Sequence, residues 1–184
     1  MQLRQPQYCC TMIGGRVFFA WCFAMTMATA QADVTQTDVL VAARALGFLQ
    51  NPPTGQIRVG IVYAADVPKS VEEADQLQRM LAGGLKVGNV DMTPVKINID
   101  ELATASVQLF LLTEYVGSDG VRVADATRAE KIPCITVDIT QVQNGNCVMG
   151  VRSQPRVEII VNRAAAAKSG TAFATVFRML ITEI

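Results

Sequence analysis

Residues 57–84 are IRVGIVYAADVPKSVEEADQLQRMLAGG, and this stretch decides the fold that the sequence predicts. Its first part, Ile57–Ala64, is a nearly continuous apolar run bounded by turn residues, which is typical of a central strand in a parallel sheet. After a short polar loop, Ser70 and Glu73 match the S-x-x-E pattern of a helix capping box. The buried stripe of that helix is Leu77, Met80 and Leu81, and the helix ends at Gly83 and Gly84. The stretch therefore predicts the strand, loop and helix that are repeated in α/β proteins.

Further strands and helices are predicted on both sides of this unit. A mostly apolar helical pattern over residues 38–50 ends at a Pro-Pro pair. The alternating apolar residues of segment 92–99 and the apolar runs at residues 107–115 and 132–139 predict three more strands. Residues 120–131 have a helical pattern. Strands that alternate with helices indicate a parallel sheet with right-handed crossovers.

The C-terminal part of the chain changes character. Two apolar segments, residues 147–151 and 156–161, are separated by a polar turn and predict an antiparallel hairpin or a bent strand pair. Asn162 should cap a short helix that ends at Gly170, and Thr171 should begin a last helix over residues 172–184. The predicted fold class is α/β: a mostly parallel central sheet flanked by helices, Rossmann-like and three-layered, with this antiparallel pair at its C-terminal end.

The first 32 residues have the pattern of a secretory signal peptide. Arg4 and Arg16 precede the apolar run Val17–Ala30, and an Ala-Gln-Ala sequence ending at Ala32 resembles a cleavage site. The apolar run is shorter than the roughly 20 residues that a membrane-spanning helix needs. We expect cleavage after Ala32 and a single domain, residues 33–184, in the periplasm; an uncleaved membrane anchor is the alternative.

The composition excludes several classes of function. The chain has no histidine, so a Ser-His-Asp or Cys-His triad cannot form. Its 16 basic and 16 acidic residues give a net charge of zero, which provides no electrostatic footprint for a nucleic acid. Two neighbouring Lys-Ser pairs remain, Lys69–Ser70 and Lys168–Ser169, but adjacent helical residues do not face each other. We therefore predict no catalytic residues, and a protein that is not an enzyme.

Two cysteines remain after the predicted cleavage, Cys134 and Cys147, at the ends of CITVDITQVQNGNC. In an oxidising compartment we expect them to form a disulfide across a strand, a reversing turn and a returning strand. Too few good zinc donors remain beside this pair, so we expect no metal and no cofactor. Whether the bridge is structural or responds to redox conditions stays open at this stage.

Two sets of residues are candidates for binding. Asp66, Lys69 and Ser70 lie in the loop after the first predicted strand, where an open α/β sheet would place a ligand, although a helix cap also explains Ser70. Leu40, Ala43 and Gly47 belong to the apolar helix at the start of the domain. That helix either completes the core or contributes to an interface with a partner or with a second copy in a homodimer.

The C-terminal third of the chain resembles the YfiR-like family of exported bacterial proteins. The resemblance rests on CVMGVRSQPRVEIIVNRAAAAKSGTAFATVFRML, residues 147–180, where an apolar strand precedes a second strand ending in Val161–Asn162. An alanine-rich helical turn closed by Gly170 and a leucine-containing last helix follow. The front of the domain is also similar, because a helix, a Pro-containing turn and an I-R-V-G-I strand occupy residues 48–61 and those before them.

This resemblance implies a periplasmic α/β domain that acts by binding, without known catalysis. Its partner would be a membrane protein with a periplasmic domain, such as the diguanylate cyclase that the family's named member restrains. The alternative function is a single-lobe periplasmic protein that binds a small ligand for a transporter or a sensor. The size of the domain distinguishes the two functions, because solute-binding proteins usually close two lobes around a ligand and this domain provides one lobe.

Overall fold

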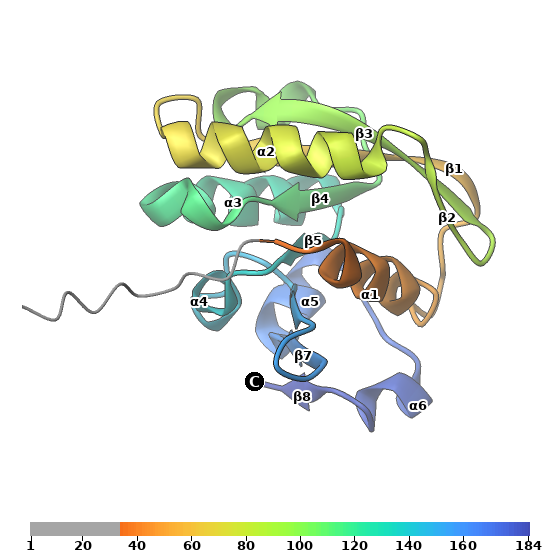
Figure 1. Cartoon of the computed structure of the whole chain (residues 1–184). Coiled ribbons are helices and arrows are strands. Elements are labelled where there is room, and N and C mark those ends of the chain that lie inside the picture. Colours follow the sequence, from red (N-terminus) through yellow and green to blue (C-terminus); the bar gives the residue numbers. More distant parts are fainter. Residues whose placement is uncertain (1–33) are drawn as a thin grey trace, which may run out of the picture. The chain divides into compact units, whose positions relative to one another are not determined.

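The computed structural model describes residues 34–184, in which strands and helices alternate (Figure 1). The predicted signal peptide lies outside the described residues. The helices are α1 (Gln36–Leu46), α2 (Pro68–Leu81), α3 (Gly120–Glu130), α4 (Ile139–Gln143), α5 (Arg163–Ser169) and α6 (Thr175–Arg178), with two 3-10 segments, η1 (Ile99–Thr104) and η2 (Glu114–Asp119). The strands are β1 (Gly55–Tyr63), β2 (Leu85–Val87), β3 (Val90–Asn98), β4 (Leu109–Leu112), β5 (Cys134–Thr136), β6 (Met149–Arg152), β7 (Glu158–Val161) and β8 (Thr182–Glu183).

These strands form one sheet in the order β2-β3-β1-β4-β5-β6-β7-β8. The central strands β3, β1, β4, β5 and β6 run parallel, whereas β2 is antiparallel to β3 and β7 is antiparallel to β6. The outermost strand, β8, pairs parallel with β7. The predicted fold class is therefore confirmed: the sheet is mostly parallel, and its antiparallel hairpin lies near the C-terminus.

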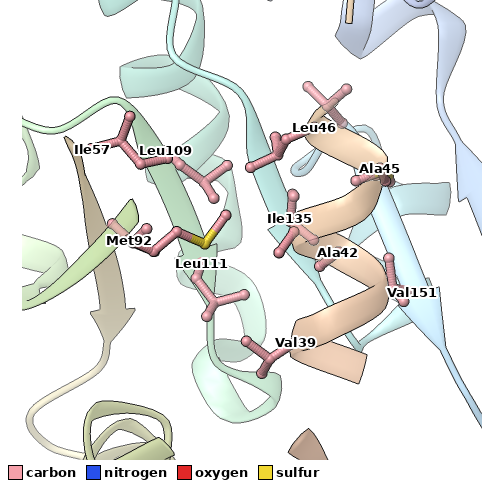
Figure 2. Close-up of a cluster of buried hydrophobic side chains, with 14 of the residues drawn as sticks. Val39, Ala42, Ala45, Leu46, Ile57, Met92, Leu109, Leu111, Ile135 and Val151 are labelled. Carbon is pink, nitrogen blue, oxygen red and sulfur yellow. The ribbon is translucent and has the colours of Figure 1, made fainter. Parts of the chain in front are cut away.

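Apolar side chains fill both faces of the sheet. Alternate residues of β4 point to opposite faces, so Leu109 and Leu111 join one buried cluster while Phe110 and Leu112 join another. α1 and α2 cover the first face, and Val123 of α3 and Val142 of α4 pack into the second. Figure 2 shows α1 lying across the first face, with its labelled side chains directed at those of the sheet. This arrangement gives three layers.

β2 was not predicted. Its three residues pair with the start of β3 around a tight turn at Gly88 and Asn89. Gly88 has φ of +59°, a left-handed conformation that glycine adopts without steric cost. The prediction placed only a turn here, because a three-residue strand is too short to show an alternating pattern.

The last predicted helix is wrong over most of its length. α6 ends at Arg178, and the chain then extends into β8 along the edge of β7. The Ile184 N–H donates to Val161 O at 2.9 Å, and the Arg163 N–H donates to Ile184 O at 3.0 Å. Phe173 and Phe177 are buried as an amphipathic helix would require, but Leu180 is exposed. Hydrogen bonds with the neighbouring strand therefore override the helical pattern of these residues.

The predicted disulfide between Cys134 and Cys147 is present, with Cα atoms 5.0 Å apart. The segment between them is not the predicted reversing turn. Residues 139–143 form α4, capped by the Asp138 side chain, and β5 runs parallel to β6. Parallel neighbours require a crossover, which a hairpin cannot supply. The bridge joins β5 to the segment just before β6, and thus to the start of the β6–β7 hairpin, as predicted.

Candidate functional site

The order of the strands creates a switch point between β1 and β4. After β1 the chain adds β3 on one side, and it then crosses over to add β4 on the other. In open α/β sheets, ligands bind at the carboxyl ends of the strands on either side of such a point. Asp66 lies in the loop after β1, Lys69 and Ser70 lie in the first turn of α2, and η2 follows β4. The sequence-predicted ligand residues therefore lie at the position that the topology favours.

Ser70 lies at this switch point, but its hydroxyl is fully engaged within the fold. The residue is buried, and its Oγ accepts a hydrogen bond from Ala64 N–H at 3.0 Å. The Thr113 hydroxyl, 2.7 Å from Ser70 Oγ, donates to Val62 O. Because each hydroxyl has one proton, Ser70 must donate to Thr113. This network ties α2 to the ends of β1 and β4, and it leaves Ser70 no donor for a ligand.

The predicted capping box at Ser70 and Glu73 is wrong. α2 begins at Pro68, with Val67 as its N-cap and no capping side chain. Proline is favoured in the first turn because its φ is already helical and no N–H is lost, so the helix begins before Ser70. Glu73 is buried, and its Oε2 accepts a hydrogen bond from the Glu114 N–H at 2.8 Å. Both residues of the S-x-x-E pattern thus hold α2 against the residues that follow β4.

Lys69 and Asp66 are exposed at the same place. The Lys69 ammonium lies 5.1 Å from the centre of the Tyr115 ring, a cation–π distance. Lys69 and Tyr115 line a pocket of about 290 Å³, whose other lining residues are Val34, Glu72, Glu73 and Gln76. The structure thus brings Lys69 to a cavity, whereas Asp66 and Ser70 are not among its lining residues. Sequence analysis missed Tyr115, which lies in a segment predicted as a strand.

The predicted interface residues of α1 have different environments. Ala43 is buried in the first cluster, Leu40 is half-buried, and Gly47 is exposed at the end of the helix. Ala43 and Gly47 also border an apolar groove of about 480 Å³ with Phe48, Pro52 and Pro53. Most of α1 therefore completes the core, and an interface role for its exposed end stays a prediction.

Asp38 fixes the start of α1. Thr35 is the N-cap and forms a capping box with Asp38, whose Oδ1 also accepts the Ser153 N–H from the β6–β7 turn at 2.6 Å. Burial raises the pKa of Asp38, but hydrogen bonds from Thr35 and Ser153 together lower it more, so that the pKa lies below its ordinary value of 3.8. The sequence-based prediction began this helix at Thr37 or Asp38, one or two residues after its first residue, Gln36.

The three most exposed large apolar side chains among the described residues lie near the C-terminus and are Val176, Met179 and Leu180. We call these three residues and the exposed Ile184 the C-terminal tip. Met179 and Leu180 have exposed fractions of 81% and 73%. The Arg178 guanidinium donates to both oxygens of Glu183, at 2.6 and 2.9 Å, and so closes the loop that presents them. These hydrogen bonds hold the pKa of Glu183 below its usual range. The sequence did not predict the tip, because residues 172–184 were expected to form one continuous helix.

Ser169 of the second Lys-Ser pair is held by hydrogen bonds within the fold. Ser169 Oγ donates to Ala166 O at 3.0 Å and lies 2.7 Å from Thr171 Oγ1, so Lys168 is not its partner. Within residues 34–184, no group of three or more Cys, Asp or Glu side chains is placed to hold a metal ion. No helix in that range is long and apolar enough to cross a membrane.

Comparisons with known proteins show the fold. No protein-family model and no curated protein matches the chain. A conserved domain protein from Vibrio cholerae is similar in structure at 12% identity with a TM-score of 0.55, over 80% of this chain and 59% of that one. A substrate-binding protein with adhesive properties from Clostridium difficile, solved in a ligand-free open form, is similar at 14% identity with a TM-score of 0.51, over 70% of this chain and 54% of its own. The chain thus spans somewhat more than half of either structure.

Proposed function

We propose that this chain is an exported, non-catalytic regulatory protein that binds the periplasmic domain of a membrane-bound signalling protein. The resemblance to the YfiR-like family suggests this class of partner, with a diguanylate cyclase as the example. The exposed C-terminal tip is the observation in the structure that supports it most strongly. Export after cleavage at Ala32 belongs to the same proposal, and the buried disulfide is compatible with it.

The C-terminal tip has the physical character of a binding surface. Exposed apolar residues that stand singly are ordinary, whereas contiguous exposed apolar surface marks interaction sites. Met179 and Leu180 are adjacent in sequence, and the Arg178–Glu183 ion pair fixes the loop that bears them. Burying either side chain against a partner would contribute about 1.5–3 kcal/mol. The tip can therefore provide a small hot spot for a protein partner.

The chemistry of the switch point supports binding rather than catalysis. The nucleophile nearest the expected ligand position, Ser70, is buried and already hydrogen-bonded on both sides. The adjacent Lys69 ammonium lies over the Tyr115 ring. Ser70 therefore has no free proton to lose and is held as part of the fold, which supports a binding role for this place over a nucleophilic one.

A pull-down from intact cells after crosslinking tests this proposal. We expect the wild-type chain to capture an integral membrane protein, and Leu180→Asp to reduce that capture at least about tenfold, as loss of a hot spot does. Val121→Asp on α3 is the matched control, because Val121 is also an exposed apolar residue, with an exposed fraction of 55%. Equal capture by wild type and Leu180→Asp would refute the role of the tip.

The second candidate function is binding of a small ligand for a transporter or a sensor. The Clostridium difficile structure of similar fold is described as a substrate-binding protein, and this chain spans 54% of it. The pocket beside Lys69 and Tyr115 at the switch point is where such a ligand would be expected. A thermal-shift screen with small metabolites tests this function, because a ligand that binds only the native state raises the melting temperature. Tyr115→Ala should abolish any such shift if the ligand occupies this pocket.

A further inference from the structure

The methionines of residues 34–184 differ sharply in their access to solvent. Met179 in the C-terminal tip has an exposed fraction of 81%. Met92 and Met149 are buried in the core at 2% and 1%, and Met80 is partly buried against the first cluster. Oxidation of methionine to its sulfoxide needs contact between the sulfur atom and a dissolved oxidant. A dissolved oxidant therefore reaches Met179 before the other methionines of this range.

The fold anchors the chain on both sides of Met179. This residue is the C-cap of α6. Two positions earlier, Phe177 is buried, and its ring stacks on that of Phe48 with the ring centroids 4.8 Å apart. The ion pair between Arg178 and Glu183 closes the loop that follows. Because both sides are anchored, the thioether of Met179 stays outside the packed core.

The disulfide is a much less accessible target for an oxidant. Cys134 and Cys147 are both buried, and their sulfur atoms are already joined to each other. Further oxidation of either sulfur would need an opening of the surrounding core. Among the sulfur atoms of the described residues, that of Met179 is therefore the first to react.

We propose that Met179 is a reversible oxidation site that weakens binding by the C-terminal tip, an inference that rests on the proposed role of the tip. The oxidant is a peroxide, which transfers one oxygen atom. The sulfur attacks one peroxide oxygen, an S–O bond forms as the O–O bond breaks, and the departing hydroxide takes up the proton of the transferred hydroxyl and leaves as water. The sulfur loses two electrons and becomes a sulfoxide. Methionine sulfoxide reductases return it to the thioether, with two electrons from a dithiol.

Oxidation makes the most exposed apolar side chain of the tip polar. A sulfoxide is polar and chiral, and it disrupts apolar interfaces that contain methionine. Burial of a methionine side chain against a partner corresponds to roughly a tenfold gain in affinity or more, which the sulfoxide removes. Met179 adds little to the packed core, so its oxidation should leave the stability of the domain unchanged.

Peroxide treatment followed by peptide mass spectrometry tests the modification itself. In the native chain we expect the sulfoxide to form at least about tenfold faster at Met179 than at Met92 or Met149, because the core must open before these two react. In denaturant, all three should react at similar rates. Similar rates in the native chain would overturn the assignment of Met179 as a selective oxidation site.

Hydrophobic-interaction chromatography measures the exposed apolar surface without any partner. Oxidised wild type should elute earlier than untreated wild type, and so should untreated Met179→Gln, which places a polar side chain of similar length at this position. Met179→Leu has no sulfur there and should elute at its own untreated position after peroxide. An unchanged elution of oxidised wild type would contradict the proposed change in the tip.

Capture from a membrane fraction separates this inference from the proposed function. The purified chain is treated with peroxide, freed of peroxide, and then crosslinked to the membranes. We expect treatment to reduce capture of an integral membrane protein by wild type at least about tenfold, and sulfoxide reductases with a dithiol to restore it. Met80→Leu is the matched control and should lose capture as wild type does, whereas peroxide should not change capture by Met179→Leu relative to its untreated sample.

The possible failures of this experiment differ from one another. Capture by wild type that peroxide leaves unchanged, or an equal loss in wild type and Met179→Leu, would refute the oxidation switch and leave the proposed function intact. If untreated wild type captures no membrane protein, the proposed function fails, and the switch fails with it.

Discussion

Ser70 is the residue on which the junction between α2, β1 and β4 depends most directly. Replacing it by alanine leaves the buried Ala64 N–H without its acceptor and Thr113 Oγ1 without the hydrogen bond that Ser70 donates. We expect Ser70→Ala to lower the free energy of unfolding by about 1–3 kcal/mol, measured by urea denaturation. Ser118→Ala, at an exposed position of η2, is the control and should change it by less than about 0.5 kcal/mol. Equal stability of the two variants would mean that the Ser70 network contributes nothing.

Asp38 should make the stability of the domain depend on pH in the acid range. Its pKa is lower in the folded protein than its ordinary value of 3.8, so the folded state favours the ionised form. The stabilisation is therefore complete above the unfolded-state pKa and is lost as the pH falls through the folded-state pKa. We expect the wild type to lose more unfolding free energy between pH 6 and pH 3 than Asp38→Asn does. Asp66→Asn removes an exposed carboxylate and should follow the wild type; a parallel decline of all three proteins would contradict this account.

Residue-level roles could be predicted only where the partner is local. The S-x-x-E pattern at Ser70 and Glu73 matches a capping box. That pattern contains no information about tertiary neighbours, so it could not predict the partners of these two residues. The actual partners, Thr113 and Glu114, lie about 40 residues further along the chain. A local signal did exist for Pro68, which favours the first turn of a helix. A prediction that started α2 at Pro68 would have placed Ser70 inside the helix and not at its cap.

At the scale of elements, the disulfide is the connection whose role the structure clarifies most. Cys134 and Cys147 are 0% and 1% exposed, so reductants and thiol reagents have no access to them in the native state. Closing a loop of this length stabilises by about 3 kcal/mol in the chain-entropy model. We expect Cys134→Ala with Cys147→Ala to lower the free energy of unfolding by about 2–5 kcal/mol. Urea denaturation of both proteins without reductant measures the difference.

Thiol labelling separates a structural bridge from a redox-responsive one. In native wild-type protein treated with a mild reductant, we expect no labelling of Cys134 or Cys147, since both are buried. In denaturant with reductant, both should react. Rapid labelling of the native protein would show that the bridge opens in the folded state and would favour the redox interpretation.

Elements with a pattern of their own were predictable, and elements defined by a neighbour were not. The apolar runs of β1 and β4 predict these strands, because strands covered on both faces have few polar residues. The alternation of Val95 and Ile97 with polar residues predicts β3. β2 and β8 have three and two residues and exist only through pairing with β3 and β7. The same limit explains the last helix, since edge pairing with β7 replaces the helical hydrogen bonds after Arg178.

For the whole molecule, the sequence was sufficient for the fold class and insufficient for the sites. Alternating strands and helices predict a mostly parallel sheet, and its switch point then follows from the strand order. The C-terminal tip depends on how distant segments pack, because β8 pairs with the edge of β7 and ends the helix that the local pattern predicts. That pairing leaves no signal in one sequence.

The central claim is that the C-terminal tip contacts a membrane-bound signalling protein. Site-specific photo-crosslinking in intact cells tests it most directly, with a benzophenone amino acid placed at position 180 or, as a control, at the exposed position 121 on α3. The account predicts a covalent adduct with an integral membrane protein from position 180 and none from position 121. An adduct only with a second copy of this chain would assign the tip to a homodimer, and it would contradict the claim, as would equal labelling from both positions.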